Sequence, residues 1–185
     1  HGMETLEDVL KNSCNDALMA IGAKMGISDF IKYQSLFNFG SKTGIDLPEE
    51  IAGIVYDQKG MNEVELATCT FGQGFTCTMI QQIASFCAVV NGGYYYQPHV
   101  VEKVLDENGK IIKSSDGMLL KPPFSNHVSS LLRQYLETTV SEGTGRKAQV
   151  PGYRVGGKTG TAEKIDYTTG TRAAGKYLVS FIGAV

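Results

Sequence analysis

The chain has 185 residues, 42% of them hydrophobic, which is enough for one domain with a sizeable core. Its net charge of −2 gives no reason to expect a nucleic acid or an anionic membrane as a partner. No apolar run approaches the roughly 20 residues of a membrane-spanning helix, and the four cysteines form no Cys-x-x-Cys pair. No histidine lies at metal-ligand spacing from them, so we predict no metal and no cofactor.

The N-terminal part is predicted to form three helices. Thr5, followed three residues later by Asp8, matches a helix-capping pair. The polar run 12–16 then places five poor helix formers together, so we expect an elbow there and a second helix that stops at Gly26. A third helix is expected over residues 28–37.

In the middle of the chain, glycines and prolines separate short segments whose apolar residues recur at regular intervals. Glycine and proline mark residues 39–50 as a loop, and Thr78 with Gln81 is expected to cap a further helix. The expected core face of that helix is Ile80, Ile83, Ala84, Cys87 and Val90. Residues 99–105 and 111–113 flank the turn sequence Asp106-Glu107-Asn108-Gly109, which predicts a β-hairpin.

The C-terminal part is predicted to be a long helix followed by two strands. The helix begins at Ser125, ends at Gly143 and presents one face made of Val128, Leu131, Leu132, Tyr135, Leu136 and Val140. The strands are expected over residues 153–162 and 176–185, joined by the polar stretch 166–175. Hairpin-linked strands beside a set of helices predict an α+β fold with an antiparallel sheet.

Lys158-Thr159-Gly160 lies in a glycine-rich segment that supports two incompatible chemistries. Residues 152–159 match the phosphate-loop pattern of nucleotide-binding enzymes. That loop needs a buried strand before it and a helix after it, whereas the preceding stretch 146–151 is basic and ends in proline. The stretch 160–170 has no apolar stripe of helical period, so the sequence context disfavours a phosphate loop.

As a strand, the same segment fits the third motif of a serine acyl-transferase. Lys158 and Gly160 would share one face, and Thr159 and Thr161 the other. A cation beside a residue without a side chain would let a peptide carboxylate lie against the strand. The tripeptide alone is weak evidence, because Lys42-Thr43-Gly44 repeats it in turn-like sequence, where we expect a structural role.

Ser13-Cys14-Asn15, at the predicted elbow, fits the Ser-x-Asn motif of the same enzymes. A turn there can present a hydroxyl and a carboxamide together into a cleft. Taken alone, residues 12–16 are better explained as helix caps, which such residues often are. The Ser-x-Asn and Lys-Thr-Gly motifs become specific evidence only because they occur with further motifs in a fixed order.

That set runs through the whole chain: Asn12-Ser13-Cys14-Asn15, Lys42-Thr43-Gly44-Ile45-Asp46-Leu47-Pro48, Gly72-Gln73-Gly74, Asn91-Gly92-Gly93, Glu142-Gly143-Thr144-Gly145, Gly156-Gly157-Lys158-Thr159-Gly160-Thr161-Ala162 and Ser180-Phe181-Ile182-Gly183. In this order the runs resemble class B penicillin-binding proteins, the peptidoglycan D,D-transpeptidases. The resemblance implies the penicillin-binding/serine β-lactamase-like fold. It also implies stem peptides ending in D-Ala-D-Ala as substrates and β-lactam antibiotics as ligands.

The same resemblance implies roles for individual residues. Ser13 would relay a proton to the leaving amine, Asn15 would hold the substrate amide, and Lys158 would orient that network. The hydroxyls of Thr159 and Thr161, on either side of Gly160, are the candidate ligands of the substrate carboxylate. The backbone N–H of Thr161 would complete an oxyanion hole, where one donor can be worth about 3 kcal/mol.

The family's nucleophile, the serine of a Ser-x-x-Lys motif, is missing, because no serine here has lysine three positions later. The family places that motif upstream of Ser-x-Asn. We therefore expect residues 1–185 to be a partial transpeptidase domain, inactive alone, that lacks the upstream Ser-x-x-Lys segment and the final sheet and helix elements. His1-Gly2-Met3 is not a natural start, and the apolar run at residues 177–185 stops without a turn, which supports this expectation.

The resemblance places the full-length protein on the extracytoplasmic face of a bacterial membrane, held by an N-terminal anchor outside this chain. Its protein partners would be membrane proteins of the division, elongation or sporulation machinery. Two alternatives stay open: a nucleotide-binding enzyme built on residues 152–159, and a non-catalytic scaffold with the penicillin-binding fold. Within the serine hydrolases, the ordered class B match disfavours a β-lactamase or a β-lactam sensor.

Overall fold

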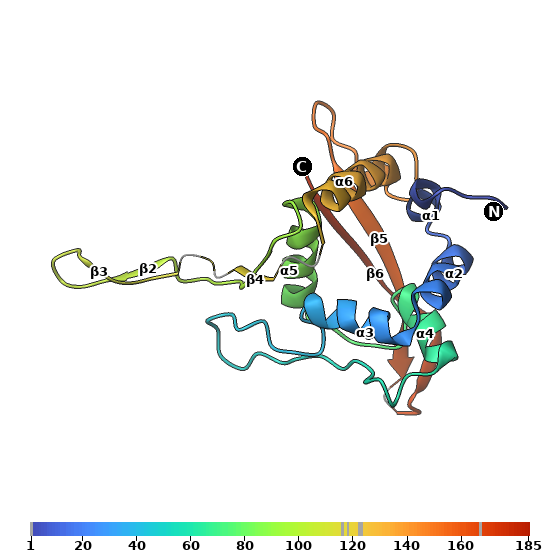
Figure 1. Ribbon diagram of the computed structural model, residues 1–185, viewed down its shortest axis with the longest axis horizontal. Coiled ribbons are helices and arrows are strands. Elements are labelled where there is room, and N and C mark those ends of the chain that lie inside the picture. The colour runs from blue at the N-terminus through green and yellow to red at the C-terminus, as the bar shows by residue number, and fades with distance from the viewer. Residues whose placement is uncertain (1, 116, 118, 122–123, 167) are drawn as a thin grey trace. The chain divides into compact units, whose positions relative to one another are not determined.

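The computed structural model describes residues 2–115, 117, 119–121, 124–166 and 168–185 (Figure 1). Its α+β composition, with every strand pair antiparallel, confirms the predicted fold class. The chain forms two compact units. The first unit contains residues 1–27, 61–74 and 131–185, and the second contains residues 28–60 and 75–130. Within the described ranges, no helix combines the length and apolarity needed to cross a bilayer.

The first unit begins with α1 (Leu6–Asn12) and α2 (Asn15–Met25), which confirms the two predicted helices and their elbow. The predicted cap is also confirmed, because the Thr5 hydroxyl accepts from the Asp8 N–H and the Asp8 carboxylate accepts from the Thr5 N–H. The α2 helix packs against α4 (Glu63–Thr70), which the sequence analysis did not predict. The contact is close, since a Cβ at Gly22 would lie 2.1 Å from Thr70 Cγ2.

The strands of the first unit are β5 (Gly156–Asp166) and β6 (Thr171–Ala184), the long antiparallel pair in Figure 1. Their register places Lys158 opposite Ile182 and Thr161 opposite Val179. The predicted linker 166–175 is too long, because pairing resumes at Thr171 after a short turn. A 3₁₀ turn, η1 (Arg146–Ala148), precedes β5.

The α6 helix (Asn126–Ser141) confirms the long C-terminal helix, and its last eleven residues belong to the first unit. Its buried face is only partly the predicted one. Leu136 and Val140 are buried as expected, whereas Val128 is 38% exposed and the fully buried positions include Ser129 and Thr139. Both hydroxyls are satisfied by carbonyls, Ser129 donating to Val89 and Thr139 to Tyr135, which makes their burial affordable.

The second unit contains α3 (Ile27–Leu36) and α5 (Met79–Val90), both predicted. It also contains the predicted hairpin of β2 (Lys103–Leu105) and β3 (Ile111–Ser114), shorter than expected because residues 99–102 are not strand. A pairing of β1 (Tyr95–Tyr96) with β4 (Leu119–Lys121) was not predicted. Tyr95, Ala84 and Ala88 form the core cluster, with Phe37 packed against it.

The predicted core face of α5 is only partly correct, because Ala84 is buried as expected but other predicted positions are not. Ile83 is 53% exposed and Cys87 is exposed, while Gln81 is fully buried. The Gln81 amide nitrogen donates to three backbone carbonyls of the second unit, those of Asn38, Ser41 and Ala52. These bonds compensate the burial of the amide. The buried face of the helix is formed by Gln81, Ala84, Ser85 and Ala88.

The second Lys-Thr-Gly copy lies in the loop predicted over residues 39–50, and the structure contains no regular element there. The Glu50 carboxylate accepts from the N–H and hydroxyl of Thr43, both at 2.6 Å, and from the N–H of Gly44 at 3.0 Å. One side chain thus fixes the turn, which supports a structural role for this copy.

Candidate active site

Ser13 lies in the turn between α1 and α2, where its backbone adopts the left-handed conformation with φ 54° and ψ 49°. This conformation ends α1, and the Ser13 N–H donates to the Leu10 carbonyl at 3.3 Å. The next residue, Cys14, is only 7% exposed and its N–H donates to the Val9 carbonyl, so it anchors the turn. Asn15 follows as the first residue of α2, with an exposed side chain.

Lys158 comes from β5, yet its ammonium group meets the Ser13 turn. Nζ donates to the Ser13 hydroxyl at 2.8 Å and to the Thr159 carbonyl at 3.1 Å. Burial lowers the pKa of this ammonium group below its ordinary value of 10.5. The structure therefore brings together two predicted site residues that are 145 positions apart in the sequence.

The remaining predicted residues follow along the same strand. Thr159 is half-buried, and its hydroxyl donates to the hydroxyl of Thr144 at 3.2 Å. The Thr161 side chain is exposed, and its carbonyl accepts from the Gln73 amide at 3.3 Å. A Cβ at Gly160 would lie 2.7 Å from the Ser180 hydroxyl on the neighbouring strand. This close approach is one reason for a glycine at position 160.

Sequence reasoning assigned no role to Thr144 or Gln73, although both contact the Lys-Thr-Gly strand. Each lies between two glycines, in the runs 142–145 and 72–74. A polar residue flanked by glycines is a usable signal, because glycine lets a backbone approach another segment closely. The contacts themselves depend on the fold and are not visible in the local sequence.

The phosphate-loop alternative is contradicted by the structure. Lys158 and Thr159 lie inside β5, which continues to Asp166. A phosphate loop would need a helix to begin at these two residues, so that amide N–H groups face the phosphates. Residues 152–159 therefore do not form a nucleotide site.

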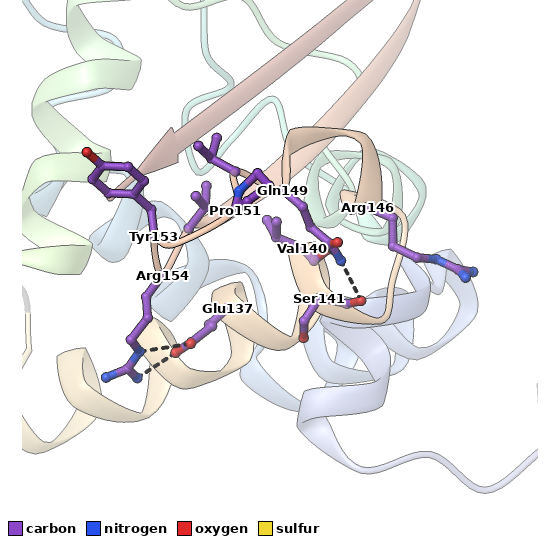
Figure 2. Close-up of a pocket in the computed structure, with 10 residues that line it drawn as sticks. Glu137, Val140, Ser141, Arg146, Gln149, Pro151, Tyr153 and Arg154 are labelled. Carbon is purple, nitrogen blue, oxygen red and sulfur yellow. Dashed lines mark hydrogen bonds and ion pairs between the residues drawn. The ribbon is translucent and has the colours of Figure 1, made fainter.

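A cavity of about 570 Å³ lies beside the segment that leads into β5, and neither Ser13 nor Lys158 lines it (Figure 2). Arg154 and Glu137 on its wall form a bidentate ion pair, with Nε–Oε1 and Nη2–Oε2 distances of 2.9 and 2.6 Å. The hydrogen bonds and charge of Arg154 lower the pKa of Glu137. This ion pair joins the segment before β5 to α6 at the protein surface.

Comparison with known proteins identifies the family. A family model described as the penicillin binding protein transpeptidase domain matches residues 1–185. The chain belongs to this family. Among curated relatives, this penicillin-binding protein chain is 43% identical over 184 residues to stage V sporulation protein D of Bacillus subtilis, covering 99% of the chain and 28% of the relative. It is 34% identical to penicillin-binding protein H of the same species, over 82% of the chain and 22% of that relative.

Solved structures agree with this assignment. Penicillin-binding protein 3 of Mycobacterium tuberculosis, in complex with aztreonam, superimposes with a TM-score of 0.89 at 27% identity, covering 97% of this chain and 41% of that one. Penicillin-binding protein 2X of Streptococcus thermophilus gives a TM-score of 0.87 at 28% identity, covering 98% and 28%. The penicillin-binding protein fold and the resemblance to class B members are confirmed. The chain spans about 28% of the length of the curated relative it matches at 43% identity.

Proposed function

We propose that the chain is part of a D,D-transpeptidase that cross-links peptidoglycan stem peptides through a serine acyl-enzyme and that binds β-lactams. The observation that carries the proposal is the 2.8 Å hydrogen bond from Lys158 to Ser13. A half-buried ammonium group that contacts a serine hydroxyl can hold that hydroxyl in position and stabilise negative charge as a proton moves through it. The family membership and the TM-score of 0.89 to a β-lactam-bound relative support the same assignment.

The nucleophile is proposed to be the serine of a Ser-x-x-Lys motif outside residues 1–185. Its hydroxyl oxygen attacks the D-Ala-D-Ala carbonyl, and the peptide bond to the terminal D-Ala breaks. The Ser13 hydroxyl passes a proton to the departing amine, while the attacking serine loses its own proton to the network. The amine of a second stem then attacks the ester, which forms the cross-link and restores the serine.

Other residues of the site are proposed to bind rather than to react. The Asn15 carboxamide holds the substrate amide, and the Thr161 N–H donates to the oxyanion. Lys158, with the hydroxyls of Thr159 and Thr161, receives the terminal carboxylate, and Gly160, which has no side chain, lets the substrate backbone approach the strand. The half-buried position of Lys158 supports this role, because partial exclusion of water strengthens its attraction for an anion.

Partners and location follow from the same proposal. We propose that the full-length protein acts on the extracytoplasmic face of the cell membrane through an N-terminal anchor. Membrane proteins of division, elongation or sporulation would be its partners. The 43% identity to a protein named for stage V sporulation supports the sporulation branch over the other two.

The test is covalent labelling with a fluorescent penicillin, read on a denaturing gel. The full-length protein should give a labelled band, and Lys158→Met should weaken it. The 185-residue chain should give none, because the attacking serine is not in it. A labelled band near 20 kDa would overturn the assignment of the nucleophile. An unlabelled full-length protein would overturn the transpeptidase proposal and favour a non-catalytic scaffold.

A further inference from the structure

The turn at residues 142–145, directly after α6, contacts residues near both members of the Ser13–Lys158 pair. The N–H of Thr144 donates to the Lys11 carbonyl at 3.1 Å, two residues before Ser13. The N–H groups of Gly143 and Gly145 both donate to the Thr139 carbonyl, at 3.2 and 3.0 Å, which closes the turn on the end of α6. A Cβ at Gly143 would lie 2.4 Å from the Lys11 carbonyl oxygen, so the turn is pressed against α1.

The side chain of Thr144 reaches the other half of the site. Its hydroxyl oxygen accepts the proton of the Thr159 hydroxyl at 3.2 Å, next to Lys158 on β5. Within the described part of the chain, the Thr144 hydroxyl donates its own proton to no partner, and the residue is exposed. One residue therefore links the Ser13 turn, through its backbone, to the Lys-Thr-Gly strand, through its side chain.

This hydrogen bond has a direction that matters for an anionic ligand. The Thr159 hydroxyl has one proton, and that proton is directed at Thr144. To donate to a carboxylate, Thr159 must turn its proton outward, and its oxygen then needs a donor behind it. When the Thr144 side chain rotates so that its hydroxyl becomes that donor, a chain runs from Thr144 through Thr159 to the carboxylate. Hydrogen bonds in such a chain polarise and strengthen one another, most strongly when the final acceptor is charged.

We propose that Thr144 is a positioning residue for the substrate carboxylate, acting through the hydroxyl of Thr159 as the second donor of a two-hydroxyl chain. The proposal rests on the transpeptidase function above, in which Thr159 binds that carboxylate. It requires a hydroxyl at position 144 and not merely a side chain of the same volume. Thr144→Val removes the donor at nearly constant shape, and Thr144→Ser keeps it.

The experiment uses the full-length protein and measures second-order acylation rate constants with two ligands, a penicillin with its free carboxylate and the methyl ester of the same penicillin. For the free acid, Thr144→Val should lower the rate constant about tenfold, the size of effect expected for one hydrogen bond to a charged group. For the ester, the loss should be less than about twofold, since the acceptor is neutral. Thr144→Ser should stay close to wild type with both ligands.

Two controls separate this role from a general effect on structure. Thr138→Val removes an α6 hydroxyl that bonds to Glu7 rather than to β5, and should affect both ligands equally. Adding Thr144→Val to Thr159→Val should cost little more than Thr159→Val alone, because the chain is already broken.

Three results would overturn the inference: equal losses for acid and ester, no loss with Thr144→Val, or full additivity with Thr159→Val. If one of these results is obtained and the wild-type protein is acylated, only the role of Thr144 is refuted. A wild-type protein that does not acylate with either ligand refutes the transpeptidase proposal and this inference with it.

Discussion

Ser13→Ala and Ser13→Gly both remove the Ser13 hydroxyl, but we expect the two variants to differ in stability. The glycine variant should be the more stable, whereas glycine is the less stable of the two inside a helix. Ser13 has φ 54° and ψ 49°, a left-handed conformation in a residue that has a Cβ. Ser13→Ala keeps the Cβ and therefore the steric cost, while Ser13→Gly removes it. Both lose the bond to Lys158, so the difference between them isolates the backbone term.

The magnitude follows from the dihedral angles. The left-handed conformation costs about 1–2 kcal/mol for a residue with a Cβ. Glycine offsets part of this gain, because it loses about 0.5–1 kcal/mol more chain entropy than alanine on folding. We therefore expect Ser13→Gly to be more stable than Ser13→Ala by roughly 1 kcal/mol. At Ala20, an exposed position of α2, Ala→Gly should instead cost about 1 kcal/mol.

Urea unfolding followed by far-UV circular dichroism measures the difference, provided that the variants share one slope against urea concentration. A free energy of unfolding for Ser13→Gly equal to or below that of Ser13→Ala would refute the reasoning. The site would then store no backbone strain at Ser13. Penicillin acylation of the full-length protein should be impaired by both replacements, since both remove the proposed proton relay.

Two pH dependences follow from shifted pKa values. Burial lowers the pKa of Lys158 in the folded chain below 10.5. At pH values between the folded pKa and 10.5, the unfolded chain still holds a proton that the folded chain has released. The free energy of unfolding should therefore rise with pH across this window. Lys158→Met should abolish the rise; an unchanged slope contradicts it. For Glu50, burial raises the pKa but the bonds from Thr43 and Gly44 outweigh it and lower the net value below 4.5. Stability should thus fall as pH drops through the folded pKa, and Glu50→Gln should flatten that fall in acid unfolding curves.

The sequence predicted those parts of the structure that depend on local rules or on known chemistry. Capping pairs at Thr5 and Thr78 placed two helix starts correctly, because the cap is made within four residues. The pairing of Ser13 with Lys158 was expected from their motifs and is seen in the structure. The α4 helix was missed although Asn62 forms a similar capping box, since its short apolar pattern was not recognised.

Two features could not be predicted from local sequence because they depend on residues that are distant in the chain. Apolar periodicity predicts the burial of Ala84 in α5 correctly but misses Gln81, which is fully buried. The carbonyls that satisfy this side chain lie 29 to 43 residues away, and no local pattern encodes them. The contact between Thr144 and Thr159 was invisible for the same reason, because it requires the turn after α6 to lie against β5.

The hydrogen bonds on β5 also affect whether its free edge can pair with a strand of another molecule. In the described residues, β5 pairs only with β6, so its other edge is a row of backbone groups open to another strand. Lys158 holds the carbonyl of Thr159, and Gln73 holds that of Thr161. A strand from a neighbouring molecule that paired at these two carbonyls would have to displace both side chains. Two side chains beside the candidate site thus occupy backbone acceptors that an added strand would otherwise use.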